Sequence, residues 1–199
     1  MEGNEENIRL TGEAERIEDF QYADMAIITN ITVLGDLEKI GKYAFSGCRS
    51  LETVLLDGSV GKIRKYAFSR CPVLRSFELT GDTGHIGRCA FRDCPALERV
   101  VFGGRLDSIG DFAFSRCCAL KSLVLPKSLA KIGEETFDSG LCVYYKGNRA
   151  EWERIEEKSN REYTLYFYSA EEPSASLSEE VGAGYWHYGP DGNPEIWSL

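Results

Sequence analysis

Apolar residues recur along this chain at a fixed interval of 23 residues. The block Ile40-Gly41-Lys42-Tyr43-Ala44-Phe45 returns in the same register, without insertion, up to Phe137. The later copies begin at Ile63, Ile86, Ile109 and Ile132, and a degenerate first copy begins at Ile17. Self-similarity at such a period is the signature of a repeat protein, in which each unit forms one turn of a solenoid.

A second pattern, in which every other residue is apolar, fills the remaining part of each unit. Val54-x-Leu56 is one copy. The others are Ile8-x-Leu10, Ile31-x-Val33, Phe77-x-Leu79, Val100-x-Phe102 and Leu123-x-Leu125. A period of two indicates a strand with one buried face. The block ending in Ala44-Phe45 follows a glycine and suits a short helical or 3₁₀ turn.

One unit cannot bury both its strand and its turn, but stacked units share a core. Six strand segments at the spacing of a parallel sheet predict a right-handed solenoid roughly 25 Å long, with short turns opposite the sheet. The inward-facing residues are Ile40, Phe45, Leu51, Val54, Leu56 and their equivalents 23 residues away. Thr83 replaces an apolar residue of the other units, so we expect the loop 80–84 to be the least well packed.

The pattern decays after Phe137. Residues 141–145 and 163–168 read as strands, and Asn148 is a good N-cap for a short helix that carries Trp152. This strand–helix–strand unit is typical of the cap that closes a solenoid. We therefore divide the chain into a solenoid (1–145), a C-terminal cap (146–170) and an acidic, aromatic tail (171–199). The solenoid comprises a degenerate N-terminal repeat (8–39) and regular repeats (40–137).

Composition narrows the classes of function. The 199 residues are 43% hydrophobic, as in a globular protein, and carry a formal charge of −9. That charge argues against nucleic-acid binding, and no apolar run approaches the roughly 20 residues of a membrane span. Residues 151–199 hold eleven Asp or Glu and three Lys or Arg, so the acidity lies mostly in the cap and tail. The N-terminus lacks the basic and apolar regions of a secretory signal.

Seven cysteines are the most conspicuous candidates for chemistry. Cys48, Cys71, Cys94 and Cys117 share one position of the repeat, where we favour buried thiols over an isolated disulfide or a metal site. His85 is expected in an exposed loop, because its equivalents are lysines and a serine. His187 is expected to pack among aromatic residues of the tail. No nucleophile–base set can be assembled, so we expect no catalytic activity, no cofactor and no metal.

The segment from Leu120 to Phe137 resembles the leucine-rich repeats of bacterial BspA-type and treponemal proteins. It reads Leu123-Val124-Leu125-Pro126-Lys127-Ser128-Leu129-Ala130-Lys131-Ile132-Gly133, and the resemblance covers about residues 8–145. It implies a leucine-rich-repeat solenoid with a parallel sheet on its concave face, and a non-enzymatic, adhesion-like role in recognising a host or cell-surface protein. It also implies a secreted or cell-surface location, with a cytoplasmic one as the alternative.

Outward-facing strand residues alternate with the buried ones and define a candidate protein-binding surface on the concave sheet. Its residues are Thr32, Thr53, Leu55, Asp57, Ser76, Glu78, Arg99, Val101, Ser122 and Val124. Leu55, Val101 and Val124 form a mildly apolar stripe flanked by hydroxyl groups. The alternatives are a structural spacer of a larger surface protein, or a carbohydrate-binding accessory module that uses the aromatic tail. We expect a monomer with no membrane insertion and no nucleic-acid partner.

Overall fold

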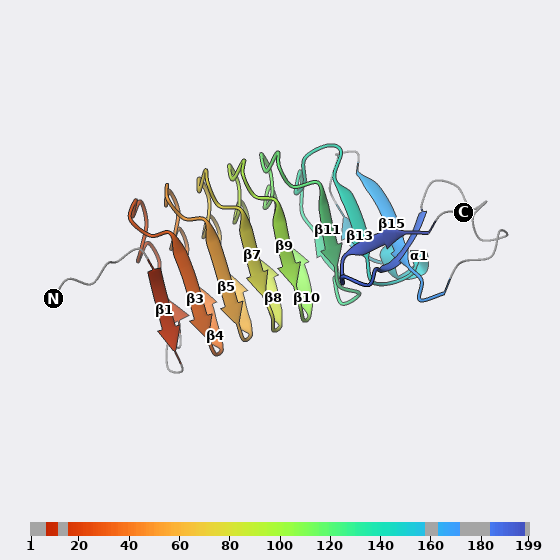
Figure 1. Cartoon of the computed structure of the whole chain (residues 1–199), viewed down its shortest axis with the longest axis horizontal. Coiled ribbons are helices and arrows are strands. Elements are labelled where there is room, and N and C mark those ends of the chain that lie inside the picture. The colour runs from red at the N-terminus through yellow and green to blue at the C-terminus, as the bar shows by residue number, and fades with distance from the viewer. Residues whose placement is uncertain (1–6, 12–15, 158–162, 172–183, 198–199) are drawn as a thin grey trace.

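Strands from successive repeats lie side by side along the long axis of the molecule (Figure 1). The computed structural model describes residues 7–11, 16–157, 163–171 and 184–197. The first sheet has the order β1-β3-β5-β7-β9, and every neighbouring pair is parallel. Its strands are β1 (Asn7–Thr11), β3 (Asn30–Leu34), β5 (Thr53–Asp57), β7 (Ser76–Leu79) and β9 (Arg99–Phe102). Val54 pairs with Ile31 and Phe77, so the register follows the 23-residue period and the predicted strands are confirmed.

A second parallel sheet runs along the solenoid, and the sequence pattern did not predict it. Its order is β14-β12-β10-β8-β6-β4-β2. The strands are β2 (Arg16–Ile17), β4 (Leu37–Ile40), β6 (Val60–Ile63), β8 (Thr83–Ile86), β10 (Leu106–Ile109), β12 (Lys131–Ile132) and β14 (Glu156–Glu157). In β4 only the two end residues are buried, so the apolar positions are three apart and no alternation marks the strand.

The segments that join the second sheet to the next strand of the first sheet are tight turns, which corrects the expectation of helical or 3₁₀ turns. Tyr43 has a left-handed φ of 56°, as the third residue of a type II turn does. The N–H of Phe45 then donates to the carbonyl of Ala67 on the next unit (2.8 Å), and the N–H of Gly47 donates to that of Ser69 (2.9 Å). A helical turn would keep these donors within its own unit, whereas here they bond one unit to the next.

The core is a ladder of phenylalanines. Phe45, Phe68, Phe91 and Phe114 stack with ring centroids 5.1 to 5.3 Å apart, and Phe137 follows Phe114 at 6.1 Å. The residues predicted to face inward in the unit of Ile40 are all buried. Stacking of identical residues on parallel units therefore fills the core, as the repeat predicts.

The cysteine column also faces the core, as predicted. The thiol of Cys71 donates to the carbonyl oxygen of Phe45 at 3.2 Å, and Cys94 makes the same contact with Phe68 at 3.1 Å. Cys48 and Cys117 contact Tyr22 and Phe91 in the same way. All seven cysteines are free thiols. Cysteine fits this column because it is small and apolar and still donates a weak hydrogen bond to the turn.

Thr83 does not lie in a loose loop, because it is the first residue of β8 and only 2% exposed. It pairs with Val60 and Leu106, and its Oγ1 has no hydrogen-bond partner in the described structure. A buried hydroxyl without a partner is destabilising.

Replacing Thr83 with Val is therefore expected to raise the free energy of unfolding by about 1 kcal/mol, because the change removes an unsatisfied hydroxyl and keeps the shape. Urea unfolding of the two proteins measures the difference. Thr164→Val on the exposed side of β15 (Thr164–Tyr168) is the matched control and should change stability little. A less stable Thr83→Val protein would mean that the hydroxyl has a partner.

The C-terminal part continues the stack of the first sheet as a third sheet, in the order β11-β13-β15-β16-β17. Its further strands are β11 (Ser122–Leu125), β13 (Cys142–Tyr145), β16 (Gly184–Tyr188) and β17 (Pro194–Ile196). The short helix α1 (Arg149–Trp152) has the predicted N-cap Asn148, which forms a capping box with Glu151. The predicted strand–helix–strand cap is present.

Sheet pairing joins the cap to the described part of the tail. The strand β16 pairs in parallel with β15 and antiparallel with β17, so the tail ends in a hairpin at the sheet edge (Figure 1). Residues 172–183 of the predicted tail lie outside the described residues. The domain boundaries at residues 145 and 170 stay a prediction.

Candidate functional site

The ten predicted surface residues lie on the outward side of the first and third sheets. Thr32, Leu55, Glu78 and Val101 are successive register partners on β3, β5, β7 and β9. Thr53, Ser76 and Arg99 form the adjacent row in the same way. Thr53, Asp57, Arg99 and Ser122 are exposed, and the other six are half-buried. The structure thus places the residues of each predicted row side by side.

Polar side chains along this face pair mainly with one another. Arg99 and Glu78 form an ion pair at 3.3 Å, with side chains 58% and 40% exposed. The hydroxyl of Thr80 donates to Asp57 at 3.0 Å. An exposed ion pair contributes at most about 1 kcal/mol, so a partner can replace it at little cost. The charged groups are available for recognition, while the half-buried Leu55 and Val101 supply apolar area between them.

The apolar row extends further than the predicted residues. Val124 pairs with Tyr144 on β13, and Tyr144 pairs with Tyr166 on β15. The two tyrosine rings stack at 5.2 Å. Sequence reasoning treated β13 and β15 as cap strands and missed their outward row. Tyr144 is itself buried, because the Trp186 ring packs against it, so the half-buried Tyr166 provides the accessible end of this row.

The hairpin of β16 and β17 closes one end of this face. A cleft of about 180 Å³ lies between β9, β11 and the hairpin, and its lining includes Val101, Val124, Tyr188 and Pro194. Lys146 lies above the Tyr188 ring, with Nζ 5.6 Å from its centre. The cleft joins residues of the predicted surface to tail residues that are far away in the sequence.

The tail aromatics are largely used in packing. Trp186 is fully buried, and its Nε1 donates to the carbonyl of Tyr145 at 3.0 Å. Trp197 is half-buried, and its Nε1 donates to Ser169 at 3.1 Å. His187 packs against the Trp197 ring at 4.0 Å, as predicted. Because stacking on a sugar requires an open ring face, Trp186 is not available for it.

His85 and Cys48 are held in packed surroundings. His85 is not in an exposed loop but half-buried in β8, with Nδ1 2.8 Å from the Ser108 hydroxyl, and burial lowers its pKa. Its lysine equivalents mark the outward row of the second sheet, a strand that the sequence did not reveal. Burial raises the pKa of Cys48 to about 11, which keeps that thiol protonated at neutral pH.

The described part of the chain holds neither a cluster of metal ligands nor a membrane-spanning helix. No three His, Cys, Asp or Glu side chains there are grouped as metal ligands would be. None of the helices described is both long and apolar enough to span a membrane.

Parallel ladders of short strands, joined by turns on a 23-residue period, define a leucine-rich-repeat solenoid. The model of the BspA type leucine rich repeat region matches residues 15–142 in six copies. The chain therefore belongs to the BspA-type leucine-rich repeat family. No curated protein matches the chain.

Solved bacterial proteins share the fold. A leucine-rich repeat protein from Bacteroides ovatus is 21% identical, with a TM-score of 0.54 over 77% of this chain and 46% of that protein. The pneumococcal vaccine antigen PcpA is 23% identical, with a TM-score of 0.60 over 73% of this chain and 42% of that protein. The chain spans less than half of the length of each of them.

Proposed function

We propose that this chain is a non-enzymatic recognition module that binds a protein partner through the outward face of the first sheet. The supporting observation is the register-aligned row in which the half-buried Leu55 and Val101 lie on either side of Glu78, whose carboxylate pairs with the exposed Arg99. Apolar area interleaved with exchangeable polar groups is compatible with a protein interface. The family and its structural relatives are compatible with this role at the cell surface.

The edge of the surface supports the same proposal. The row continues through Val124 into the cleft beside the β16–β17 hairpin, so one end of a bound partner would meet a wall. Shape of this kind adds complementarity that a flat sheet lacks. We propose that the chain acts as a monomer, with a host or cell-surface protein as its partner.

The double substitution Leu55→Arg with Val101→Arg is expected to weaken binding of that partner about 30-fold or more, because each change replaces an apolar contact with a long, charged side chain in the middle of the interface. Both side chains are half-buried on the outward side, so folding should be retained. Pull-down of secreted, matrix and same-cell proteins identifies the partner, and titration of the purified partner measures the affinity.

A matched control carries the same added charge away from the sheet. Ala130→Arg with Ala150→Arg changes two exposed residues outside the proposed surface and should bind as the wild type does. A partner retained equally by both double variants would exclude this face. Failure to recover any partner would favour the alternative function of a structural spacer.

A further inference from the structure

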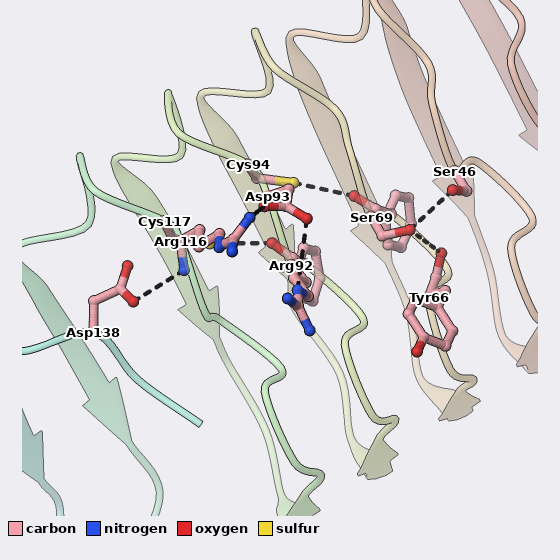
Figure 2. Close-up of polar contacts among 11 residues, drawn as sticks. Ser46, Tyr66, Ser69, Arg92, Asp93, Cys94, Arg116, Cys117 and Asp138 are labelled. Carbon is pink, nitrogen blue, oxygen red and sulfur yellow. Dashed lines mark hydrogen bonds and ion pairs between the residues drawn. The ribbon is translucent and has the colours of Figure 1, made fainter. Parts of the chain in front are cut away.

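A groove with a cavity volume of about 630 Å³ follows the turns that lead out of the second sheet. We call it the arginine groove. Its wall includes Phe20, Tyr43 and Tyr66 towards one end and Arg70, Arg92 and Arg116 towards the other. Figure 2 shows the arginine end, where Arg116 from one turn reaches the Asp93 of the turn before it. None of these residues belongs to the proposed surface on the first sheet.

The central turn segments carry a positive charge in an acidic protein. Residues 41–52, 64–75, 87–98 and 110–121 together hold ten Lys or Arg and four Asp or Glu, a net charge of +6, whereas the equivalent segments at the two ends, 18–29 and 133–144, hold six Asp or Glu and no Lys or Arg. A local potential of opposite sign to the rest of the molecule favours an anionic partner at this edge.

The arginines in the groove are incompletely neutralised. Asp93 lies between two of them, with Arg116 at 3.2 Å and Arg92 at 3.6 Å. Arg70 takes part in none of the ion pairs of the described structure. Three guanidinium groups and one carboxylate therefore meet at this end, while Asp24 lies at the aromatic end. A guanidinium group suits a carboxylate ligand because it offers paired donors in one plane.

Backbone conformation places these residues along one wall, because the same two positions of each turn are left-handed from unit to unit. Phe20, Tyr43, Tyr66, Arg70 and Arg116 have φ between 56° and 63°, which costs about 1 kcal/mol for a residue other than glycine. Stacking repays the aromatic residues, because Tyr43 lies 4.9 Å from Phe20 and 4.7 Å from Tyr66.

The left-handed backbone at Arg70 and Arg116 belongs to the repeat, because Asp24, Gly47 and Asp93 at the same position also have a positive φ. The equivalent position one unit earlier than Arg70 is Gly47, which adopts its φ of 75° without strain. The turn itself therefore does not require arginine at positions 70 and 116.

We propose that the arginine groove binds an acidic peptide segment that carries one apolar residue. Carboxylates of the peptide pair with Arg70, Arg92 and Arg116, and the apolar side chain packs on Phe20, whose ring is 60% exposed. A sulfated polysaccharide would also satisfy the arginines, but its sugar rings offer less apolar surface to the Phe20 end than a hydrophobic side chain does. The combination of a cationic end and an apolar end therefore favours a peptide.

The probe is a fluorescein-labelled peptide, Phe-Ser-Glu-Glu-Ser-Glu-Glu, titrated with the whole chain and followed by fluorescence anisotropy. We expect saturable binding that weakens as salt is added, since exposed charges are screened. Arg70→Glu with Arg116→Glu should lower the affinity at least 10-fold, and Phe20→Ala should lower it several-fold. A peptide with Lys in place of Glu should not bind.

Two controls locate the site. Arg154→Glu changes an exposed arginine of the cap and should leave peptide binding unchanged. Leu55→Arg with Val101→Arg should also leave it unchanged, so this proposal and the proposed function fail separately. If the charge-reversed variant does not fold, Arg70→Gln with Arg116→Gln replaces it. Absence of peptide binding, equal binding by the arginine variants, or binding of heparin in place of the peptide would overturn the proposal.

Discussion

Replacing Phe91 with Ala is expected to lower the free energy of unfolding by about 3–5 kcal/mol. Phe91 is fully buried in the middle of the phenylalanine ladder, 5.3 Å from Phe68 and 5.1 Å from Phe114. Its ring also meets Phe77 edge-on at 4.7 Å. Truncation leaves a cavity that rigid parallel units cannot collapse to fill.

The position of Phe91 in the stack enlarges the effect. In a solenoid each unit contacts only its neighbours, so a defect in a central unit weakens the coupling on both sides. Chemical unfolding followed by circular dichroism measures the loss, and a second transition would show that the two halves have become separate. Val73→Ala is the control, since Val73 is 37% exposed and should matter little. An unchanged melting temperature for Phe91→Ala would contradict the ladder.

The period and the alternation together predicted the first sheet and the core, because both depend on which residues are apolar. The second sheet escaped the same reasoning. Its strands bury only their end residues, as Leu37 and Ile40 do, and therefore resemble loop sequence. These strands form because of the repeat, since each strand pairs with the equivalent strand 23 residues away.

The arginine groove shows a second limit of pattern reading. The sequence predicts a helical or 3₁₀ turn for the block that contains Tyr43. In the structure Tyr43 and Arg70 have left-handed φ values and line the groove together, and a positive φ is not expected for a bulky residue from its sequence. The outward row of the first sheet could be predicted from the sequence, because strand alternation alone defines it. The position of the hairpin at the end of that row could not be predicted, because β16 follows β15 only after a long interval.

Replacing Trp186 with Ala is expected to detach the β16–β17 hairpin from the third sheet. Trp186 is fully buried, and its ring meets Tyr144 at 5.5 Å, Tyr168 at 5.2 Å and Tyr188 at 5.0 Å. Removing a buried tryptophan side chain costs about 3–5 kcal/mol. A two-stranded hairpin has little stability of its own. The lost free energy therefore weakens the pairing of the hairpin with β15.

Hydrogen exchange measures that detachment directly. Amide protection in β16 should fall about a hundredfold or more, while protection in β5 and β7 should remain, because local opening involves only the affected unit. Ile196→Ala changes an exposed residue of the same hairpin and is the control. If β16 keeps its protection in the Trp186→Ala protein, the indole does not anchor the hairpin. If protection is lost, the cleft beside Val101 and Val124 opens, and affinity for a partner on the first sheet then reports how far the hairpin shapes that surface.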